Sequence, residues 1–279
     1  MDCITKIRNS FIHHGRNSNR IYVMSLEIND LPDLLVELEE LAKKKHYTKI
    51  IAKVPIIAKE YFEENGFIME AAIPGFYAGK QECCFYAKYL ENERKINLCQ
   101  EQCDKVLEIA GGKKTIVQSP VLSDTYTFRR LAEKDIDKMI QLYQSVFKSY
   151  PFPIYDKKYL EETMKSNVSY FGIFDQEYLI SASSIEAEEK YKNAELTDFA
   201  TLKKYRGQGL ALFLLAQMEQ YMREMGFCIA YTIARSKSYS MNCTFAKMGY
   251  MYTGILVNNT QIGGQIESMN IWWKRIEEK

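Results

Sequence analysis

The chain has 279 residues, of which 47% are hydrophobic and 26% charged, a composition typical of folded globular proteins and not of disordered ones. Its 37 Lys and Arg residues against 36 Asp and Glu give a net charge of +1, which excludes overall charge as the means of binding nucleic acid or an anionic membrane. All three histidines lie within the first 46 residues, so the second half of the chain has no histidine to offer as a catalytic base.

The N-terminal segment and the cysteines indicate the cellular compartment of the protein. The first twenty residues are polar and lack the apolar core of a signal peptide, and no run of about 18 apolar residues predicts a membrane span. The seven cysteines are odd in number and irregularly spaced, which favours reduced thiols in a cytoplasmic protein. Cys99 and Cys103 fall one helical turn apart, but without other ligands nearby they indicate two half-buried thiols, and we expect no metal.

The first part of the chain predicts an α/β region over residues 1–110. Its apolar patterning predicts the following elements: strands at 21–26, 48–54, 67–73 and 82–90, and helices at 32–45, 56–65 and 95–109. Two glycines and a proline then mark residues 111–123 as a linker.

Residues 124–279 predict a second α/β domain with a mixed sheet. The expected strands are 126–131, 169–174, 177–187, 194–202, 228–234, 250–258 and 267–274, and the expected helices are 133–148, 157–165, 208–225 and 239–248.

The two regions show a faint internal repeat. A shift of 183 residues superimposes three aromatic or glycine positions of the first region on three of the second: Phe62, Gly66 and Phe67 on Phe245, Gly249 and Tyr250. Both common ancestry and coincidence between two β-α-β patterns explain such matches. If the repeat is real, the first region is a degenerate copy, because it has no counterpart of the glycine-rich turn described next.

The strongest local motif is Arg206-Gly207-Gln208-Gly209-Leu210-Ala211, which follows a predicted strand and opens a long apolar helix. Glycines let a ligand approach the backbone closely, and the free N–H groups of a first helical turn attract an anion. Arg206 adds a positive charge. The motif therefore predicts a pyrophosphate site, although a tight strand-to-helix turn without a ligand has the same glycines.

The pattern Arg-x-x-Gly-x-Ala after Phe199-Ala200-Thr201 resembles the acetyl-CoA loop of the GNAT N-acetyltransferases, and the element order of the second region resembles their fold. The resemblance implies a mixed, mostly antiparallel sheet flanked by helices, with a bulged strand splayed from its neighbour. It also implies that acetyl-CoA lies against the backbone of Phe199 and Thr201, like an added strand, with its pyrophosphate on residues 206–211. Asn242 matches a cofactor-contacting Asn of many relatives, and a helix-capping role is the alternative.

Acetyl transfer to an aliphatic amine needs a base, because the amine has a pKa near 10 and arrives protonated. Glu195 lies eleven positions before Arg206, the spacing of the general base in some relatives, and is our first candidate; Asp198 is the second. Strand alternation puts Glu195 and Asp198 on opposite faces, and a solvated carboxylate at a strand end is the alternative. Phe245 stands where relatives often have a Tyr that acts as the general acid. Either Tyr239 or another Tyr protonates the leaving thiolate instead, or the thiolate leaves unaided and takes a proton from water.

The polar C-terminal segment 258–274, the N-terminal extension and the total length resemble the β-lysine N6-acetyltransferases. The resemblance implies a small-molecule substrate, β-lysine, and a product that serves as an osmolyte. Glu267 is the candidate for binding its second amine, and Arg235 or Asn270 for binding its carboxylate. Another small amine, a protein lysine, or a non-catalytic acyl-CoA sensor remain alternatives. We expect the first region to shape the substrate site or a homodimer interface.

Overall fold

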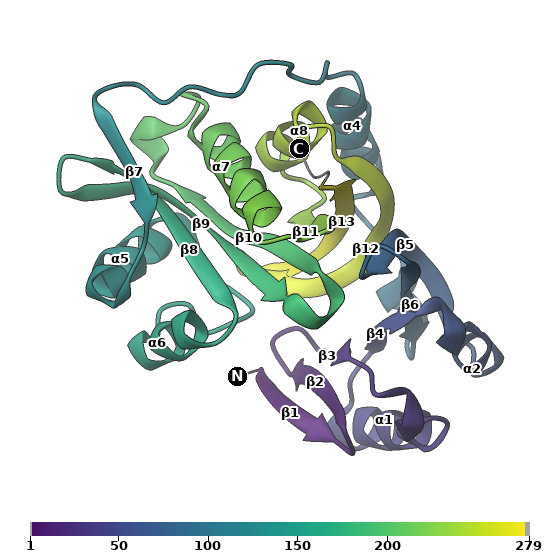
Figure 1. Ribbon diagram of the computed structural model, residues 1–279. Helices are drawn as coiled ribbons and strands as arrows, with labels where there is room; N and C mark the ends of the chain where they lie inside the picture. Colours follow the sequence, from purple (N-terminus) through teal and green to yellow (C-terminus); the bar gives the residue numbers. More distant parts are fainter. Residues whose placement is uncertain (1, 277–279) are drawn as a thin grey trace.

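Two β-sheets, one from each half of the chain, form the framework of the protein (Figure 1). The computed structural model describes residues 2–276, in which the first sheet has six strands in the order β1-β2-β3-β4-β6-β5 and the second has seven in the order β12-β13-β11-β10-β9-β8-β7. The first sheet and its helices are β1 (Cys3–Ile7), β2 (Ser10–Gly15), β3 (Arg20–Ser25), α1 (Asp33–Lys45), β4 (Lys49–Pro55), α2 (Lys59–Glu64), β5 (Ile68–Tyr77) and β6 (Gln81–Tyr89). Two connecting helices follow, α3 (Asn92–Lys95) and α4 (Gln100–Gly111).

The second sheet confirms the predicted mixed, mostly antiparallel architecture. Its elements are β7 (Tyr126–Arg130), α5 (Ile136–Val146), α6 (Lys157–Lys165), β8 (Val168–Asp175), β9 (Tyr178–Glu188), β10 (Asn193–Thr201), α7 (Leu210–Glu224), β11 (Ile229–Arg235), α8 (Tyr239–Lys247), β12 (Met251–Ile262) and β13 (Gln265–Arg275). Within the described residues, β10 and β11 are the one parallel pair of this sheet. The helices α7 and α8 share one apolar core with the sheet, while α5 and α6 share a separate core with β8 and β9.

The first sheet repeats the topology of the second. Strands β1-β2-β3-β4-β6-β5 correspond in order and direction to β8-β9-β10-β11-β13-β12, with the parallel pair β3–β4 in the place of β10–β11. The matched aromatic pairs also pack alike: the rings of Phe62 and Phe67 lie 5.0 Å apart at 76°, and those of Phe245 and Tyr250 lie 5.0 Å apart at 74°. The glycine before the second aromatic residue has a φ of +76° in one copy and +78° in the other. The same helix-to-strand corner therefore occurs twice.

The first two strands and the position of α4 are the main departures from the expected elements. Strands β1 and β2 were not predicted, and β1 is largely exposed, so it lacks the apolar alternation that would reveal it. Helix α4 packs beside α8, and its Ala110 is buried in the core of the second sheet. The backbone N–H of Ile116 donates to Lys247 O at 2.8 Å. The boundaries at 110 and 123 stay a prediction, but α4 contributes to the second core.

The two sheets meet in a shared core at their neighbouring strands. Strands β5 and β12 come so close that a Cβ on Gly254 would lie 2.1 Å from the carbonyl oxygen of Glu70. A buried ion pair joins Lys49 to Glu70 at 2.8 Å, and the same ammonium donates to Val257 O at 2.7 Å. Side chains of both sheets form one apolar cluster here, including Tyr22, Ile51, Phe85, Tyr231 and Met269. Among residues 2–276, no helix combines the length and apolar character needed to cross a bilayer.

Candidate active site

The centre of the second sheet opens between β10 and β11. The two strands pair only from Asn193 to Glu195, after which β10 continues along β9 alone to Thr201. The β10–β9 register shifts between Thr197 and Ala200, which marks a β-bulge. The bulge and the divergence of the strands agree with the splayed strand that the sequence resemblance implied, and they leave the backbone edge of residues 196–201 unpaired toward β11.

A cavity of about 190 Å³ lies at this opening, and both halves of the chain line it. The second sheet contributes Glu195, Thr197 and Phe199 from β10 and Glu186 from β9. The first sheet contributes charged and aromatic side chains: Arg20, Tyr22 and Lys53. The loop between α5 and α6 closes one wall with Tyr150 and Phe152. Its volume is below the roughly 300–1,000 Å³ of pockets that take drug-sized ligands, so the cavity suits a small molecule.

Two carboxylates face each other in the cavity. Glu195 is the cross-strand partner of Glu186, which places their side chains side by side on one face of the sheet. Burial, followed by the charge of Glu186, raises the pKa of Glu195 to about 8. Burial also raises the pKa of Glu186. Like charges placed this way repel each other, so the pair holds a proton readily and favours a cationic ligand.

Lys53 brings a compensating positive charge from the first sheet. Its ammonium lies 3.4 Å from the hydroxyl of Tyr231, which is paired with Glu195 across the β10–β11 ladder. Its charge lowers the pKa of both Glu186 and Glu195, opposing the effect of burial. Lys53 therefore limits how far the acidic pair is driven toward the protonated state.

Asp198 lies in the same cavity as Glu195, which corrects the expectation that strand alternation separates them. The bulge places Asp198 at a φ of +55°, so the alternation of side chains breaks at this residue. Its two oxygens each accept a hydrogen bond at 2.6 Å, one from the Tyr150 hydroxyl and one from Ser184 Oγ. Asp198 thus anchors the α5–α6 loop through Tyr150, while Glu195 is the freer carboxylate.

The glycine-rich turn has the geometry that the motif predicted. Gly207 and Gly209 adopt φ values of +81° and +76°, and a Cβ at either would meet nothing within 4 Å. Gly209 is the N-cap of the fifteen-residue α7, whose first N–H groups face this open space. The side chain of Arg206 is exposed and its Nε donates to Thr201 O at 3.1 Å, which fixes it beside the helix start. Gln208 is exposed as well and accepts from the Tyr126 hydroxyl at 2.9 Å.

The remaining predicted cofactor residue, Asn242, is fully occupied inside the protein. Its amide nitrogen donates to the carbonyl oxygens of Arg235 and Ser238 at 3.0 and 2.8 Å. Its amide oxygen accepts from Asn270 Nδ2 and Trp272 Nε1, both at 2.8 Å. The geometry favours a structural role that joins α8 to β11 and β13, and the cofactor contact of Asn242 stays a prediction without a free polar atom to support it.

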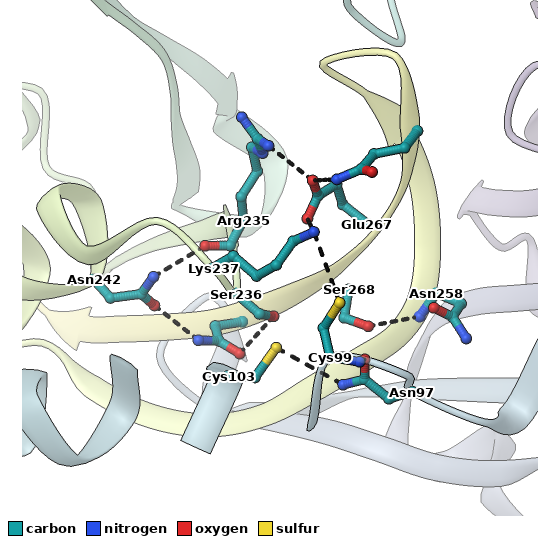
Figure 2. A network of polar contacts seen from close by, with 12 residues as sticks. Asn97, Cys99, Cys103, Arg235, Ser236, Lys237, Asn242, Asn258, Glu267 and Ser268 are labelled. Carbon is teal, nitrogen blue, oxygen red and sulfur yellow. Dashed lines mark hydrogen bonds and ion pairs between the residues drawn. The ribbon is translucent and has the colours of Figure 1, made fainter. Parts of the chain in front are cut away.

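Two of the three predicted substrate residues, Arg235 and Glu267, lie side by side in a polar network (Figure 2), which Asn270 joins through Asn242. Glu267 is buried and paired with Arg235 Nη2 at 2.8 Å and with Lys237 Nζ at 3.3 Å. Burial alone would raise the pKa of Glu267, but hydrogen bonds from Gln265 and Arg235 reverse this and lower it. Two cations already neutralise this carboxylate.

Of these three residues, Arg235 lines the cavity, whereas Glu267 and Asn270 are not among the residues that line it. Asn270 is buried between Ser236 Oγ, at 2.9 Å, and Asn242. The structure therefore does not bring Glu267 and Asn270 to the cavity, and their substrate contacts stay predictions that the geometry does not support.

Tyr239, the tyrosine named as a candidate general acid, falls outside the cavity, whereas five other tyrosines line it: Tyr22, Tyr150, Tyr159, Tyr170 and Tyr231. Tyr239 is 39% exposed at the first position of α8 and does not line the cavity. Phe245 does line it, packed edge-to-face against Phe199 at 5.7 Å. The position where relatives often have a Tyr thus forms an apolar wall. Among residues 2–276 no cluster of three or more potential metal ligands occurs.

The sequence prediction missed Glu186, Lys53 and Arg20. Pairing the predicted strands 177–187 and 194–202 as a hairpin would have placed Glu186 opposite Glu195, because cross-strand register follows from hairpin geometry. Lys53 and Arg20 come from the other sheet, and no local pattern in the sequence indicates that they reach this cavity.

Comparisons with known proteins place this geometry in context. Residues 127–252 match the family model described as "Acetyltransferase (GNAT) domain". The chain is 40% identical to the β-lysine N(6)-acetyltransferase of Methanococcus maripaludis, over 99% of this chain and 100% of that protein. It is 33% identical to the enzyme of the same name from Methanosarcina mazei, over 86% of this chain and 95% of that protein. It is 32% identical to the N-acetyltransferase YodP of Bacillus subtilis, over 88% of this chain and 87% of that protein.

Proposed function

Because the chain belongs to the GNAT family of acetyltransferases, we propose that it transfers the acetyl group of acetyl-CoA to the N6 amine of β-lysine. The protein is an acyltransferase, and acetyl-CoA is the acyl donor of its family. Two curated relatives that align over most of their length bear the name of a β-lysine N(6)-acetyltransferase. The structural observation on which the proposal rests is the facing pair Glu186 and Glu195 in a small cavity, because it suits an ammonium group.

The residues proposed to bind acetyl-CoA have a geometry that suits its pyrophosphate and its pantetheine arm. The positive φ values of Gly207 and Gly209 and the open space in front of them leave room for a pyrophosphate on the first N–H groups of α7. Arg206 adds charge beside them. The unpaired edge at Phe199 and Thr201 offers backbone groups to the pantetheine arm. Bound there, acetyl-CoA supplies an activated thioester.

Glu195 is the proposed general base. The substrate amine, with a pKa near 10, enters as an ammonium ion and is attracted by the pair of carboxylates. Glu195 takes one proton from it, and the neutral amine that is left would attack the thioester carbon. The C–N bond forms as the C–S bond breaks, and the second amine proton ends on the departing CoA thiol. A raised pKa suits this role, because a base works best when its pKa is close to the working pH. Asp198 is less suited to it, since both of its oxygens already accept hydrogen bonds.

The geometry of the cavity also bears on the two alternative functions, acetylation of a protein lysine and non-catalytic sensing of acyl-CoA. A small cavity walled by the α5–α6 loop and the first sheet favours a free amine over a lysine on a protein surface. A sensor that only binds acyl-CoA has no need for two opposed, half-buried carboxylates, which cost stability. The seven cysteines lie within the described residues and form no disulfide there, which supports the proposal of a cytoplasmic enzyme.

The test is thiol release from acetyl-CoA with β-lysine, α-lysine, ornithine and spermidine, using the wild-type protein, Glu195→Gln and Asp198→Asn. We expect β-lysine to be the best substrate. We expect Glu195→Gln to lower kcat by about 10²–10⁴-fold, the usual contribution of a general base, while the KM for acetyl-CoA stays within about twofold.

The activity of Glu195→Gln should recover as the pH approaches the amine pKa of about 10, because the free amine then no longer needs a base. Asp198→Asn should show no such recovery. An Asp198→Asn variant that loses as much activity as Glu195→Gln and recovers at high pH would move the base to Asp198. Thiol release with none of the amines would contradict acetyl transfer to this substrate class.

A further inference from the structure

Arg20, the first residue of β3, presents a buried guanidinium group to the cavity. Its exposed fraction is 3%, and it is one of the residues that line the cavity. Within residues 2–276 its side chain forms no ion pair and no hydrogen bond, and its Nε and Nη1 are buried without any partner. A buried charged donor left without an acceptor is costly, so such a group is kept only where a ligand or water satisfies it.

In the described part of the chain, no group around Arg20 forms an ion pair with it: the charge of the nearby Asp2 carboxylate raises the pKa of Arg20, but the oxygens of Asp2 accept from the backbone N–H groups of Asn17 and Ser18. The guanidinium lies over the ring of Tyr22, 5.0 Å from its centroid. The neighbouring Arg94 uses its own donors on Ser18 O, Thr48 Oγ1 and Asn258 O. The nearby carboxylate of Glu70 is paired with Lys49. The first sheet thus brings to the cavity wall a positive charge that has no ion-pair partner among residues 2–276.

The other two cations that line the cavity are less available to an anion. Arg235 already donates from Nη2 to Glu267 at 2.8 Å, and only its Nε is buried without a partner. Lys53 lies close enough to Glu186 and Glu195 for its charge to lower the pKa of both. A carboxylate placed beside Lys53 would therefore meet two negative charges. An anionic ligand group is therefore best accommodated at Arg20.

An acceptor atom without a partner lies in the same cavity. The side-chain oxygen of Asn259, on β12, is buried without a hydrogen-bond donor, and the residue is 3% exposed. It lines the cavity together with Arg20. An amide oxygen accepts hydrogen bonds and suits an ammonium group. The cavity wall therefore combines a buried cation, two of whose donor atoms lack partners, with a buried acceptor that lacks a donor, apart from the acidic pair.

We propose that Arg20 binds the carboxylate of the amino-acid substrate and that Asn259 accepts a hydrogen bond from its second amine. This inference rests on the proposed function. It adds that residues of the first sheet make the enzyme prefer zwitterionic diamino acids to polyamines. A guanidinium binds a carboxylate through two parallel hydrogen bonds, which gives geometric selectivity as well as affinity.

The test compares β-lysine with 1,4-diaminopentane, the same diamine without its carboxyl group, in the wild-type protein and in Arg20→Gln. For the wild type we expect kcat/KM to be about 30- to 100-fold higher with β-lysine, in the range of a charged hydrogen bond. Arg20→Gln should remove this preference through a higher KM for β-lysine. Its kcat/KM with 1,4-diaminopentane should change by less than about threefold, since that substrate makes no charged contact with Arg20.

Arg20→Lys and Arg16→Gln are the controls. Arg20→Lys keeps the charge without the paired donors, so it should raise the KM for β-lysine alone, and it serves where Arg20→Gln does not fold. Arg16 is exposed on the same segment, so Arg16→Gln should leave both substrates unchanged.

An equal loss with both substrates in the Arg20 variants would mean a structural role for Arg20 and overturn the inference. A wild type that does not distinguish the two amines would overturn it as well. A wild type that acetylates no amine would instead overturn the proposed function itself.

Discussion

At the scale of single residues, the chemistry depends on the balance between one lysine and two glutamates. Glu186 and Glu195 face each other across β9 and β10, and both pKa values are raised by burial. Lys53 comes from the other sheet and lowers both. When both carboxylates are deprotonated, they and the one ammonium leave a single negative charge, which a substrate ammonium then neutralises.

Lys53→Met should move the pH dependence of the enzyme toward higher pH. Glu195 must be deprotonated to act as a base, so kcat/KM rises as the pH passes through its pKa of about 8. Removing the positive charge raises this pKa further, because Lys53 lowers it in the intact protein. If the pKa of Glu195 rises by about one, the deprotonated fraction at pH 7, and kcat/KM with it, falls about tenfold.

The measurement is kcat/KM for β-lysine between pH 6 and pH 10. Lys53→Arg keeps the charge and should keep the wild-type profile. A Lys53→Met profile that is lower at every pH without any displacement would mean that Lys53 positions the site and does not tune it.

Residue types and spacing predicted part of this site. Glu195 follows from its distance to the glycine-rich turn, and Arg235 lines the cavity as expected. Glu267 was selected as a free carboxylate, but its charge is taken up by Lys237 and Arg235, and such partners become visible only once β11 and β13 are paired. Sequence spacing records which groups are present, not which ones already have partners.

At the scale of elements, two backbone irregularities make the site. The bulge in β10 turns Asp198 into the cavity, and the glycine-rich turn gives α7 an open start. Helix α7 was predictable because its buried residues recur at helical spacing: Leu210, Leu214, Leu215, Met218 and Met222. The bulge was implied only by the family resemblance, because one extra residue in a strand leaves no mark on apolar periodicity.

Gly209→Ala should weaken acetyl-CoA binding selectively. At a φ of +76° alanine is strained, and its Cβ would occupy the space in which the pyrophosphate is proposed to lie. We expect the KM for acetyl-CoA to rise about tenfold, corresponding to roughly 1–2 kcal/mol of strain or lost contact, with the KM for the amine nearly unchanged.

Gly226→Ala is the matched control, because Gly226 has a φ of +70°, also faces open space and follows the other end of α7. Both variants should lose similar stability in thermal unfolding. An acetyl-CoA KM that rises equally in both would show that strain alone, and not the loss of a cofactor contact, explains the effect.

At the scale of the whole molecule, one strand topology is used twice with different helix starts. In the second half Gly209 caps α7 and leaves its first N–H groups open, whereas in the first half the corresponding helix α1 is capped by Pro32, which has no N–H. The repeat was predictable from a few aromatic and glycine positions. The face-to-face packing of the two copies was not, because it depends on side chains spread over both sheets, such as Tyr22 and Tyr231.

The molecule should bind one acetyl-CoA per chain. The first half lacks the open, glycine-capped helix start, so it offers no second pyrophosphate site. Isothermal titration of the wild-type protein with CoA should give a stoichiometry of one, and Gly209→Ala should weaken that single event. Two equivalent sites per chain would contradict this division of roles, and sedimentation of the same samples tests the predicted homodimer.

The cavity has walls from both sheets, and this gives its occupant a mechanical part. A diamino acid that binds Glu195 with one group and Arg20 with another would connect the two halves of the chain. Acetyl-CoA, bound on β10 and α7, would contact only the second half of the chain. Binding of the amino acid would therefore link the two halves and make the molecule stiffer, whereas binding of acetyl-CoA alone would not.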